Sequence, residues 1–224
     1  MVETINLTAT DGHTMEALWA EPSGKPRGGL LVLQEIFGLT DHLKRLCAKF
    51  AEKGYAVCAP ALFDRVERGL NLAYVGDDYQ KGLNLRKDMR PEWMMLDCQA
   101  GIEMLRPAGR VGTIGYCYGG YVAWLAATEL NTLDCAISLY GGGVADICER
   151  ETKCAVQLHF GDSDRAIPLD HVQRIKNAHP EIPTYVYDDA PHAFCTDDRD
   201  GAYRPEACKR ATARALDFLA EHLD

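Results

Sequence analysis

The chain has 224 residues, of which 47% are hydrophobic and 25% are charged. This length and composition allow a large buried core and predict one globular domain over residues 1–224, which excludes disordered and collagen-like classes. Lys and Arg total 24 against 33 Asp and Glu, a formal net charge of −9. Such a surface should repel nucleic acid and anionic lipid, so we expect neither as a partner.

The cysteine pattern and the N-terminal segment bear on the compartment of the protein. Met1–Thr10 lacks the basic and apolar regions of a secretion signal, and no apolar run is long enough to cross a membrane. Nine cysteines without a Cys-x-x-Cys pair favour neither a disulfide framework nor a structural metal site. We therefore expect a cytoplasmic protein, monomeric or weakly homo-oligomeric, with mostly reduced cysteines. Those in apolar stretches are expected to be small buried hydrophobes: Cys47, Cys58, Cys135 and Cys154.

The first elements in chain order indicate a hairpin and a buried strand. Residues 3–21 alternate loosely around Asp11-Gly12, a dipeptide suited to a two-residue turn, and predict an antiparallel edge. Residues 29–34 are continuously apolar, as expected of a strand covered on both faces. A helix follows, capped by Thr40 or Asp41 and ended by Gly54.

The remaining segments alternate between strand and helix patterns. Residues 61–90 contain scattered glycines among mixed charges and predict an irregular excursion near the site. The other predicted strands are 55–59, 111–114, 135–139, 155–160 and 184–187, and the other predicted helices are 91–105, 119–130, 169–178 and 205–223. This alternation predicts an α/β fold with a mainly parallel sheet, helices on both faces and ligands beyond the carboxyl ends of the strands.

The strongest local signal is the run from Gly115 to Gly120, Gly-Tyr-Cys-Tyr-Gly-Gly, between a predicted strand and a predicted helix. It has the form of a nucleophile elbow with Cys117 at the centre. Glycines flank the nucleophile because this strained turn leaves no room for side chains there. The helix N-terminus would favour the thiolate. The alternative is a glycine-rich turn with an incidental buried cysteine, whereas nucleotide-binding fingerprints are absent.

An elbow nucleophile needs a base and an acid, which follow it in the order acid, then histidine. Asp164 lies just past one predicted strand and His192 just past the last, with Asp162 as the weaker alternative acid. His192 would take the thiol proton and later activate water, and Asp164 would orient the imidazole. The other histidines lack comparable placement and are expected to be surface or structural residues: His13, His42, His171 and His222.

Glu35 closes an apolar strand, which would put its carboxylate at the same end of the sheet as Cys117. An ordinary exposed turn acid is the alternative. Burial would raise the pKa of this carboxyl and suit it to proton exchange with the thiol. The backbone N–H groups of Ile36 and Tyr118 are the expected oxyanion donors.

Together these motifs resemble the dienelactone hydrolase family, also called carboxymethylenebutenolidases, over nearly the whole chain. The motifs concerned are Gln34-Glu35-Ile36-Phe37-Gly38, the Cys117 elbow, the Asp164 loop and His192-Ala193-Phe194. The resemblance implies an α/β-hydrolase fold, no metal or organic cofactor, and hydrolysis of the small anionic enol lactone 4-carboxymethylenebut-2-en-4-olide (dienelactone) to maleylacetate in aromatic catabolism. It also implies that Cys117 is the nucleophile, His192 the base, Asp164 its partner and Glu35 a group that helps to create the thiolate.

The chain departs from the pattern of this family in its substrate-binding residues. Well-known bacterial members place an arginine soon after the motif histidine to hold the substrate carboxylate, where this chain has Cys195, Thr196 and Asp197. Tyr118 stands where a leucine is common, which would change the shape of the pocket. The residues expected to bind substrate are Phe37, Tyr140, Lys81 and Arg86, with Arg90 as a further basic candidate.

The chemistry of sulfur favours activated substrates. A thiolate leaves more readily than an alkoxide, so its adduct with an alkyl ester reverts, whereas an enol lactone or a thioester can expel its own leaving group. The first hypothesis is therefore a hydrolase of a small enol lactone. A thioesterase or carboxylesterase on another activated acyl substrate is the alternative within enzymes, and a hydrolase-like receptor or thiol redox sensor is the alternative outside them.

Overall fold

The computed structural model describes residues 1–224 and contains one eight-stranded sheet. Its order is β1-β2-β4-β3-β5-β6-β7-β8, in which β1, β2 and β4 pair antiparallel and the other pairs are parallel. The strands are β1 (Val2–Thr8), β2 (Thr14–Ala20), β3 (Gly28–Leu33), β4 (Tyr55–Pro60), β5 (Val111–Tyr116), β6 (Cys135–Leu139), β7 (Ala155–Gly161) and β8 (Thr184–Tyr187). The predicted α/β class, with an N-terminal antiparallel hairpin on a mainly parallel sheet, is confirmed.

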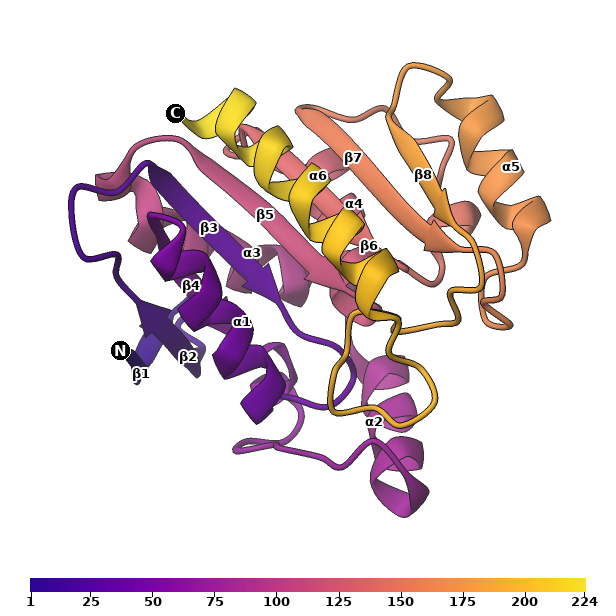
Figure 1. The fold of residues 1–224 in the computed structure, drawn as a ribbon. Helices are drawn as coiled ribbons and strands as arrows, with labels where there is room; N and C mark the ends of the chain where they lie inside the picture. Colours follow the sequence, from indigo (N-terminus) through magenta and orange to yellow (C-terminus); the bar gives the residue numbers. More distant parts are fainter.

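Helices cover both faces of this sheet (Figure 1). On one face lie α1 (Asp41–Glu52) and α6 (Pro205–Leu223), and on the other lie α3 (Pro91–Leu105) and α4 (Tyr118–Glu129). Helix α5 (Leu169–Ala178) lies at the β8 edge. None of the helices combines the length and the apolar character that a membrane span requires.

The apolar run of β3 shows why the central strands read as continuously hydrophobic. Leu30 and Val32 belong to the core beneath α1 and α6, and Leu31 and Leu33 belong to the core beneath α3 and α4. All four are essentially inaccessible to solvent. Since alternate side chains of a strand point to opposite faces, both sets must be apolar when both faces are covered.

Two local predictions are settled by hydrogen bonds. Thr40, and not Asp41, caps α1, since its Oγ1 accepts from the backbone N–H of Leu43 at 3.2 Å. The hairpin turn is longer than the predicted two residues, because the N–H of Ala9 donates to the carbonyl of His13 at 2.8 Å and leaves three residues between them. Gly12 alone in that turn takes a positive φ, of 85°.

The prediction of an irregular excursion over residues 61–90 is wrong in its second half. Gly76–Asp88 forms helix α2, and a 3₁₀ turn spans Leu62–Arg65. The glycines suggested a broken chain, but Gly82 serves packing, since a Cβ there would collide with the Ile36 carbonyl. The glycine therefore allows α2 to pack closely against the loop that follows β3.

Candidate active site

The elbow at Cys117 connects β5 to α4 at the carboxyl end of the central strand. Cys117 has φ 55° and ψ −112°, a backbone conformation that L-residues rarely adopt. A Cβ at Gly115 would collide with the Gly119 carbonyl, and one at Gly119 would collide with the Leu33 carbonyl. The glycines thus let the strand, the turn and the helix meet closely enough to project the cysteine alone.

Cys117, His192 and Asp164 form a continuous chain of hydrogen-bonding contacts. His192 Nε2 lies 3.1 Å from Cys117 Sγ, and His192 Nδ1 lies 2.7 Å from Asp164 Oδ2. The other carboxylate oxygen of Asp164 accepts from the backbone N–H groups of Ala166 and Ile167 at 2.8 and 3.1 Å. These bonds and its burial hold the carboxylate towards the imidazole.

Asp162, the weaker candidate acid, is exposed and accepts a hydrogen bond from the hydroxyl of its neighbour Ser163. The two acids of this loop therefore differ sharply in environment. Of the two, Asp164 contacts the imidazole.

The surroundings of His192 favour its protonated form. Burial by itself would lower the pKa of His192, but the charge of the Cys117 thiolate and the hydrogen bond to Asp164 outweigh it and raise that pKa to about 10. Tyr140 packs edge-on to the imidazole, with ring centroids 5.4 Å apart. An imidazolium beside a thiolate can supply a nucleophile and an acid at neutral pH.

Two backbone N–H groups border the nucleophile. Those of Ile36 and Tyr118 belong to residues that line the same cavity as Cys117, and neither donates a hydrogen bond within the chain. The side chain of Tyr118 turns into the core, where it stacks on Phe63 and its hydroxyl donates to Met94 Sδ at 2.8 Å. The bulky ring of Tyr118 is therefore held in the core, and its backbone N–H is left without a partner in the chain.

Glu35 is 7% exposed, which excludes an ordinary solvated turn acid. Burial raises its pKa above the usual range, and the nearby charges of His42, His192 and Arg199 oppose this only in part. Its Oε1 accepts from the Thr196 hydroxyl at 3.2 Å, and no hydrogen bond joins it to Cys117. The carboxyl is thus held by the loop that carries His192.

The cavity at Cys117 has a volume of about 230 Å³. Phe37 and Arg86 line it, as the sequence predicts for substrate-binding residues. Hydrogen bonds position both, since the Phe37 carbonyl accepts from the N–H of Leu72 and Arg86 Nη2 donates to the Gly142 carbonyl at 3.1 Å. The full lining is Ile36, Phe37, Tyr79, Leu83, Arg86, Cys117, Tyr118, Gly142, Gly143, Asp146, Ala166, His171, His192 and Arg199.

Two other predicted substrate-binding residues do not reach this cavity. Lys81 is on an outer face of α2, where its Nζ pairs with Glu67 at 2.6 Å. Tyr140 is fully buried beneath His192 and supports the imidazole from behind. Arg90, the further basic candidate, stacks over the Trp93 ring at 4.6 Å.

Sequence reasoning missed Arg199 and the place of His171 at the cavity. Arg199 lines the cavity and lies two residues beyond the segment in which a carboxylate-binding arginine was sought. His171, expected at the surface or in a structural role, also lines it. His42 is buried, and its Nδ1 lies 2.7 Å from Asp197 Oδ1, so its role is structural. Finding Arg199 from sequence would have required the path of the loop after His192.

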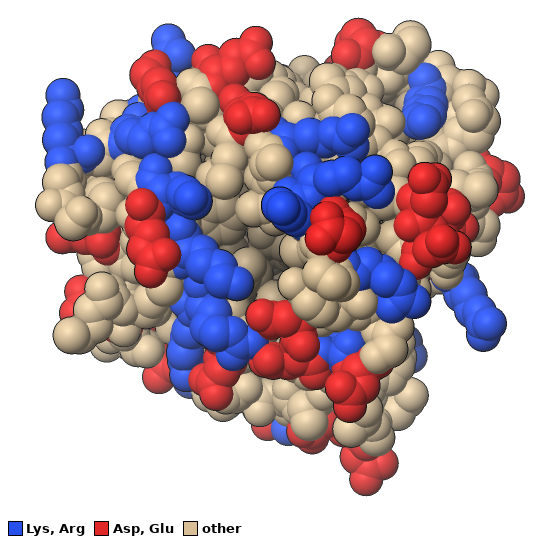
Figure 2. Space-filling model, viewed as in Figure 1, with Lys and Arg blue, Asp and Glu red and all other residues tan.

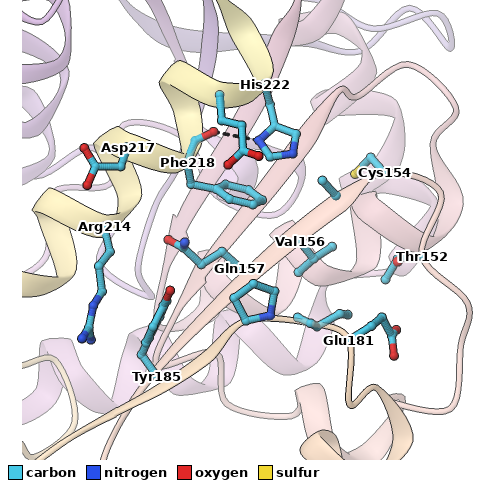
Figure 3. A pocket seen from close by; sticks show the side chains of 14 residues that line it. Thr152, Cys154, Val156, Gln157, Glu181, Tyr185, Arg214, Asp217, Phe218 and His222 are labelled. Carbon is cyan, nitrogen blue, oxygen red and sulfur yellow. Dashed lines mark hydrogen bonds between the residues drawn. The ribbon is translucent and has the colours of Figure 1, made fainter.

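A second hollow, of about 510 Å³, lies between the starts of β7 and β8 and the end of α6 (Figure 3). Arg214, Tyr185, Gln157 and His222 are among its lining residues, and Cys154 lies at its edge. Its histidine is bound to its own helix, since His222 Nδ1 lies 2.8 Å from the Phe218 carbonyl. Although larger, this hollow has no nucleophile paired with a base.

Comparison with known proteins agrees with the geometry around Cys117. Carboxymethylenebutenolidases from Pseudomonas putida and Pseudomonas knackmussii are each 30% identical over 236 residues, which covers 98% of this chain and 97% of the relative. A Klebsiella pneumoniae structure, provisionally assigned as a dienelactone hydrolase, superposes with a TM-score of 0.82 at 26% identity and 99% coverage of both chains. The fold is also shared, at a TM-score of 0.77 and 22% identity, with a dienelactone hydrolase-like promiscuous phosphotriesterase from metagenomic libraries, over 100% of this chain and 99% of that one. The sequence model of the dienelactone hydrolase family matches residues 15–223, and the chain therefore belongs to this family of hydrolases.

Proposed function

We propose that this hydrolase opens a small anionic enol lactone, with dienelactone to maleylacetate as the reaction, through an acyl-enzyme on Cys117. The observation that carries the proposal is the contact of Cys117 Sγ with His192 Nε2 at 3.1 Å, with Asp164 bound to the far nitrogen. The names of the Pseudomonas relatives point to the same reaction.

In the first half of the reaction, the Cys117 thiolate attacks the lactone carbonyl. The N–H groups of Ile36 and Tyr118 donate to the oxyanion that forms, and each such donor is worth roughly 2.7 to 4 kcal/mol in other enzymes. The C–O bond to the enol oxygen then breaks, and the His192 imidazolium gives its proton to the departing enolate. The product of this step is a thioester that retains the whole opened substrate.

In the second half, neutral His192 takes a proton from water, and the resulting hydroxide adds to the thioester carbonyl. Collapse of the adduct returns the Cys117 thiolate and releases the carboxylic acid, which loses its proton to solvent and leaves as the carboxylate, while His192 keeps the proton taken from water. Asp164 stabilises the imidazolium in both halves. The cycle thus ends in the ion pair with which it began, and one water has been consumed.

The enol oxygen is what makes a cysteine suitable here. A tetrahedral adduct expels its better leaving group, and a thiolate leaves before a simple alkoxide, so an alkyl ester returns to the free enzyme. An enolate is stabilised by conjugation and competes with the thiolate. Activated acyl compounds should therefore be turned over, and alkyl esters and peptides should not.

The charge of the cavity favours an anionic substrate. Arg86 and Arg199 enter it from α2 and from the loop after His192, against a single carboxylate of Asp146. A guanidinium binds a carboxylate through paired, charge-assisted hydrogen bonds. We propose that these two arginines hold the carboxylate of the substrate, in place of the arginine that other family members carry nearer to the histidine.

Glu35 is proposed to assist ionisation of Cys117. Burial raises the pKa of this carboxyl, so it takes up a proton more readily than a solvated glutamate does. Thr196 holds this carboxyl through the hydroxyl bond described above. The group lies on the loop that supplies the Ile36 donor, and it therefore acts beside the oxyanion.

The test is steady-state kinetics with dienelactone beside matched aryl esters, alkyl esters and acyl thioesters. Cys117→Ser is expected to lower kcat/KM on dienelactone by about 10³-fold or more, because a serine hydroxyl is not ionised by this histidine. Circular dichroism checks that the variant is folded. Wild-type kcat/KM in this variant would contradict nucleophilic catalysis by the sulfur.

The same assays separate the alternatives. If the protein is inactive on dienelactone but rapidly hydrolyses thioesters or aryl esters, the proposed substrate is wrong and the proposed residue roles stand. Stoichiometric acylation of Cys117 without steady-state turnover would support a receptor function and would contradict the proposal that the protein is an enzyme.

A further inference from the structure

A second pair of thiols lies outside the catalytic site. Cys195 belongs to the loop between β8 and α6 and is 5% exposed, whereas Cys208 lies in the first turn of α6 and is partly exposed. Both line a cavity of about 200 Å³ between α1 and α6, separate from the one at Cys117. Solvent can therefore reach Cys208 without entering the cavity at Cys117.

Backbone hydrogen bonds bring the two cysteines together. The N–H of Arg204 donates to the Phe194 carbonyl at 2.9 Å, which closes the loop just before α6. The N–H of Cys208 donates to the Arg204 carbonyl at 2.9 Å, one helical turn further on. Cys208 Sγ consequently lies 4.0 Å from the Cys195 carbonyl oxygen, so the two cysteines are neighbours where the loop meets α6.

The surroundings of Cys208 favour its thiolate. The neighbouring Cys195 thiol is the main cause that lowers the pKa of Cys208. Thr212 and the charge of Lys49 add to it, and burial and the Asp197 carboxylate oppose it. Figure 2 shows basic side chains along α1 and again beside α6, with an uncharged hollow between them. Lys49 and Lys53 line the cavity itself, together with the acidic residues Glu52 and Asp197.

Cys195 has the complementary property. Burial and the neighbouring sulfur of Cys208 raise the pKa of Cys195, so Cys208 is the thiol of the pair that ionises more readily. A partly exposed thiolate beside a protonated thiol is the arrangement in which oxidation of the first sulfur is resolved by the second.

We propose that Cys208 and Cys195 form a peroxide-sensitive dithiol that closes to a disulfide. The Cys208 thiolate attacks one oxygen of a hydroperoxide and the O–O bond breaks. The departing alkoxide, or hydroxide when the oxidant is hydrogen peroxide, takes a proton from solvent, and the products are a sulfenic acid and an alcohol or water. Cys195 sulfur then attacks the sulfenic sulfur, the S–S bond forms, and hydroxide leaves with the Cys195 proton as water. The two thiols lose two electrons in total, and the peroxide gains them.

The bridge would fasten the segment that supplies the catalytic cavity. Thr196, which binds Glu35, and Arg199, which lines the cavity, lie between the two cysteines in sequence. His192 lies just before them. A covalent link of about 2.05 Å between the sulfurs would join the start of this segment to α6. Oxidation of Cys195 and Cys208, which lie outside the catalytic cavity, would thus restrict the segment that carries residues inside it.

The first test is disulfide mapping. The protein is treated with a small excess of hydrogen peroxide, free thiols are alkylated, and the digest is analysed by mass spectrometry without reduction. We expect a cross-linked peptide pair joining Cys195 to Cys208, removed by dithiothreitol, in the wild type and equally in Cys117→Ser. This readout does not depend on catalytic activity, so it is independent of the proposed function.

Three variants sharpen the mapping. Cys195→Ser should leave a sulfenic acid on Cys208 that dimedone traps, and Cys208→Ser should give no cross-link at residue 195. Cys154→Ser, which removes another partly exposed thiol, is the matched control and should keep the cross-link. Absence of the Cys195–Cys208 peptide, or a cross-link from either residue to Cys117 in its place, would overturn the proposal.

A second measurement tests whether the bridge fastens the loop. A disulfide that closes a short loop stabilises the folded state, and we expect oxidation to raise Tm by about 5 °C in wild type and not in Cys208→Ser. Cys195→Ser and Cys208→Ser each replace a sulfur by a hydroxyl of similar size, so under reducing conditions both variants should have a Tm near that of the reduced wild type. If the disulfide is detected but Tm is unchanged or lower, the disulfide does not stabilise the loop, and that part of the proposal is wrong.

Discussion

The cavities at the two ends of the sheet differ in the segments that line them. At the carboxyl ends of the strands, a cavity of about 230 Å³ receives side chains from loops after β3, β5, β6, β7 and β8. At the amino ends of β7 and β8, a hollow of about 510 Å³ is lined mainly by those two strands and α6 (Figure 3). The smaller one contains Cys117 and His192, the proposed nucleophile and base, because parallel strands deliver successive loops to the same edge. Convergence of loops, and not volume, distinguishes the reactive end.

Asp164→Asn should cause the largest loss after the nucleophile itself. The variant removes the charge that stabilises the His192 imidazolium, and kcat on dienelactone is expected to fall by about 10²- to 10⁴-fold. Asp162→Asn is the matched control, since that acid is exposed in the same loop and should leave kcat within about twofold of wild type. Equal losses in the two variants would contradict the assignment of Asp164.

The pH profile gives a second readout of the same pair. His192 has a raised pKa of about 10, so its imidazolium is present below that pH and is lost as the pH rises through it. The alkaline limb of kcat/KM should therefore lie near pH 10 in wild type. Asp164→Asn removes one of the groups that raise this pKa, so the limb should move to lower pH. A limb that moves to higher pH would contradict the electrostatic role of Asp164.

Arg199→Gln should separate charged from neutral substrates. Loss of a charge-assisted hydrogen bond costs about 1.5 to 3 kcal/mol, so kcat/KM on anionic dienelactone should fall by about 10- to 100-fold, while a neutral aryl ester should change by about twofold or less. Lys81→Gln is the control, because that lysine pairs with Glu67 outside the cavity. Parallel losses on neutral and anionic substrates would show that Arg199 acts on the loop and not on a carboxylate.

Glu35→Gln should have a smaller effect. The amide preserves the acceptor for the Thr196 hydroxyl but cannot exchange a proton, so we expect the thiolate fraction and kcat/KM to fall about tenfold, equivalent to one pKa unit. The pH dependence of Cys117 alkylation by iodoacetamide measures this directly. Thr196→Val removes the same hydrogen bond and leaves the carboxyl in place, which separates positioning from proton exchange. An unchanged alkylation profile in Glu35→Gln would contradict a role in ionisation.

The contrast between the two ends also explains how far sequence reasoning reached. Cys117, Asp164 and His192 could be placed because each follows a strand of recognisable pattern, and parallel strands bring those ends together. Arg199 could not, because its position depends on how the loop returns to α6 through the bond between Arg204 and Phe194.

Helix α2 shows a different limit. Tyr79, Leu83 and Arg86 line the cavity at helical spacing, while Lys81 falls on another face. Only when residues 76–88 are assigned as a helix does the helical periodicity place Arg86 and Lys81 on different faces. Gly82 was the misleading signal, since its contact with the Ile36 carbonyl is a tertiary feature that local sequence does not record.

Arg214→Met tests the unreactive end and should have the smallest effect on catalysis. Arg214 stacks over the Tyr185 ring at 4.0 Å and donates to the Tyr187 hydroxyl at 3.1 Å, so it ties α6 to β8 without contact with the catalytic cavity. Because a cation–π contact and a hydrogen bond are lost, the free energy of unfolding should fall by about 1 to 2 kcal/mol and Tm by about 2 to 6 °C. Methionine retains the apolar stem, so these losses belong to the guanidinium. Steady-state kinetics at a temperature well below Tm should give kcat/KM within about twofold of wild type on dienelactone. A tenfold loss there, with Tm unchanged, would mean that the larger hollow takes part in the reaction and that loop convergence alone does not mark the reactive end.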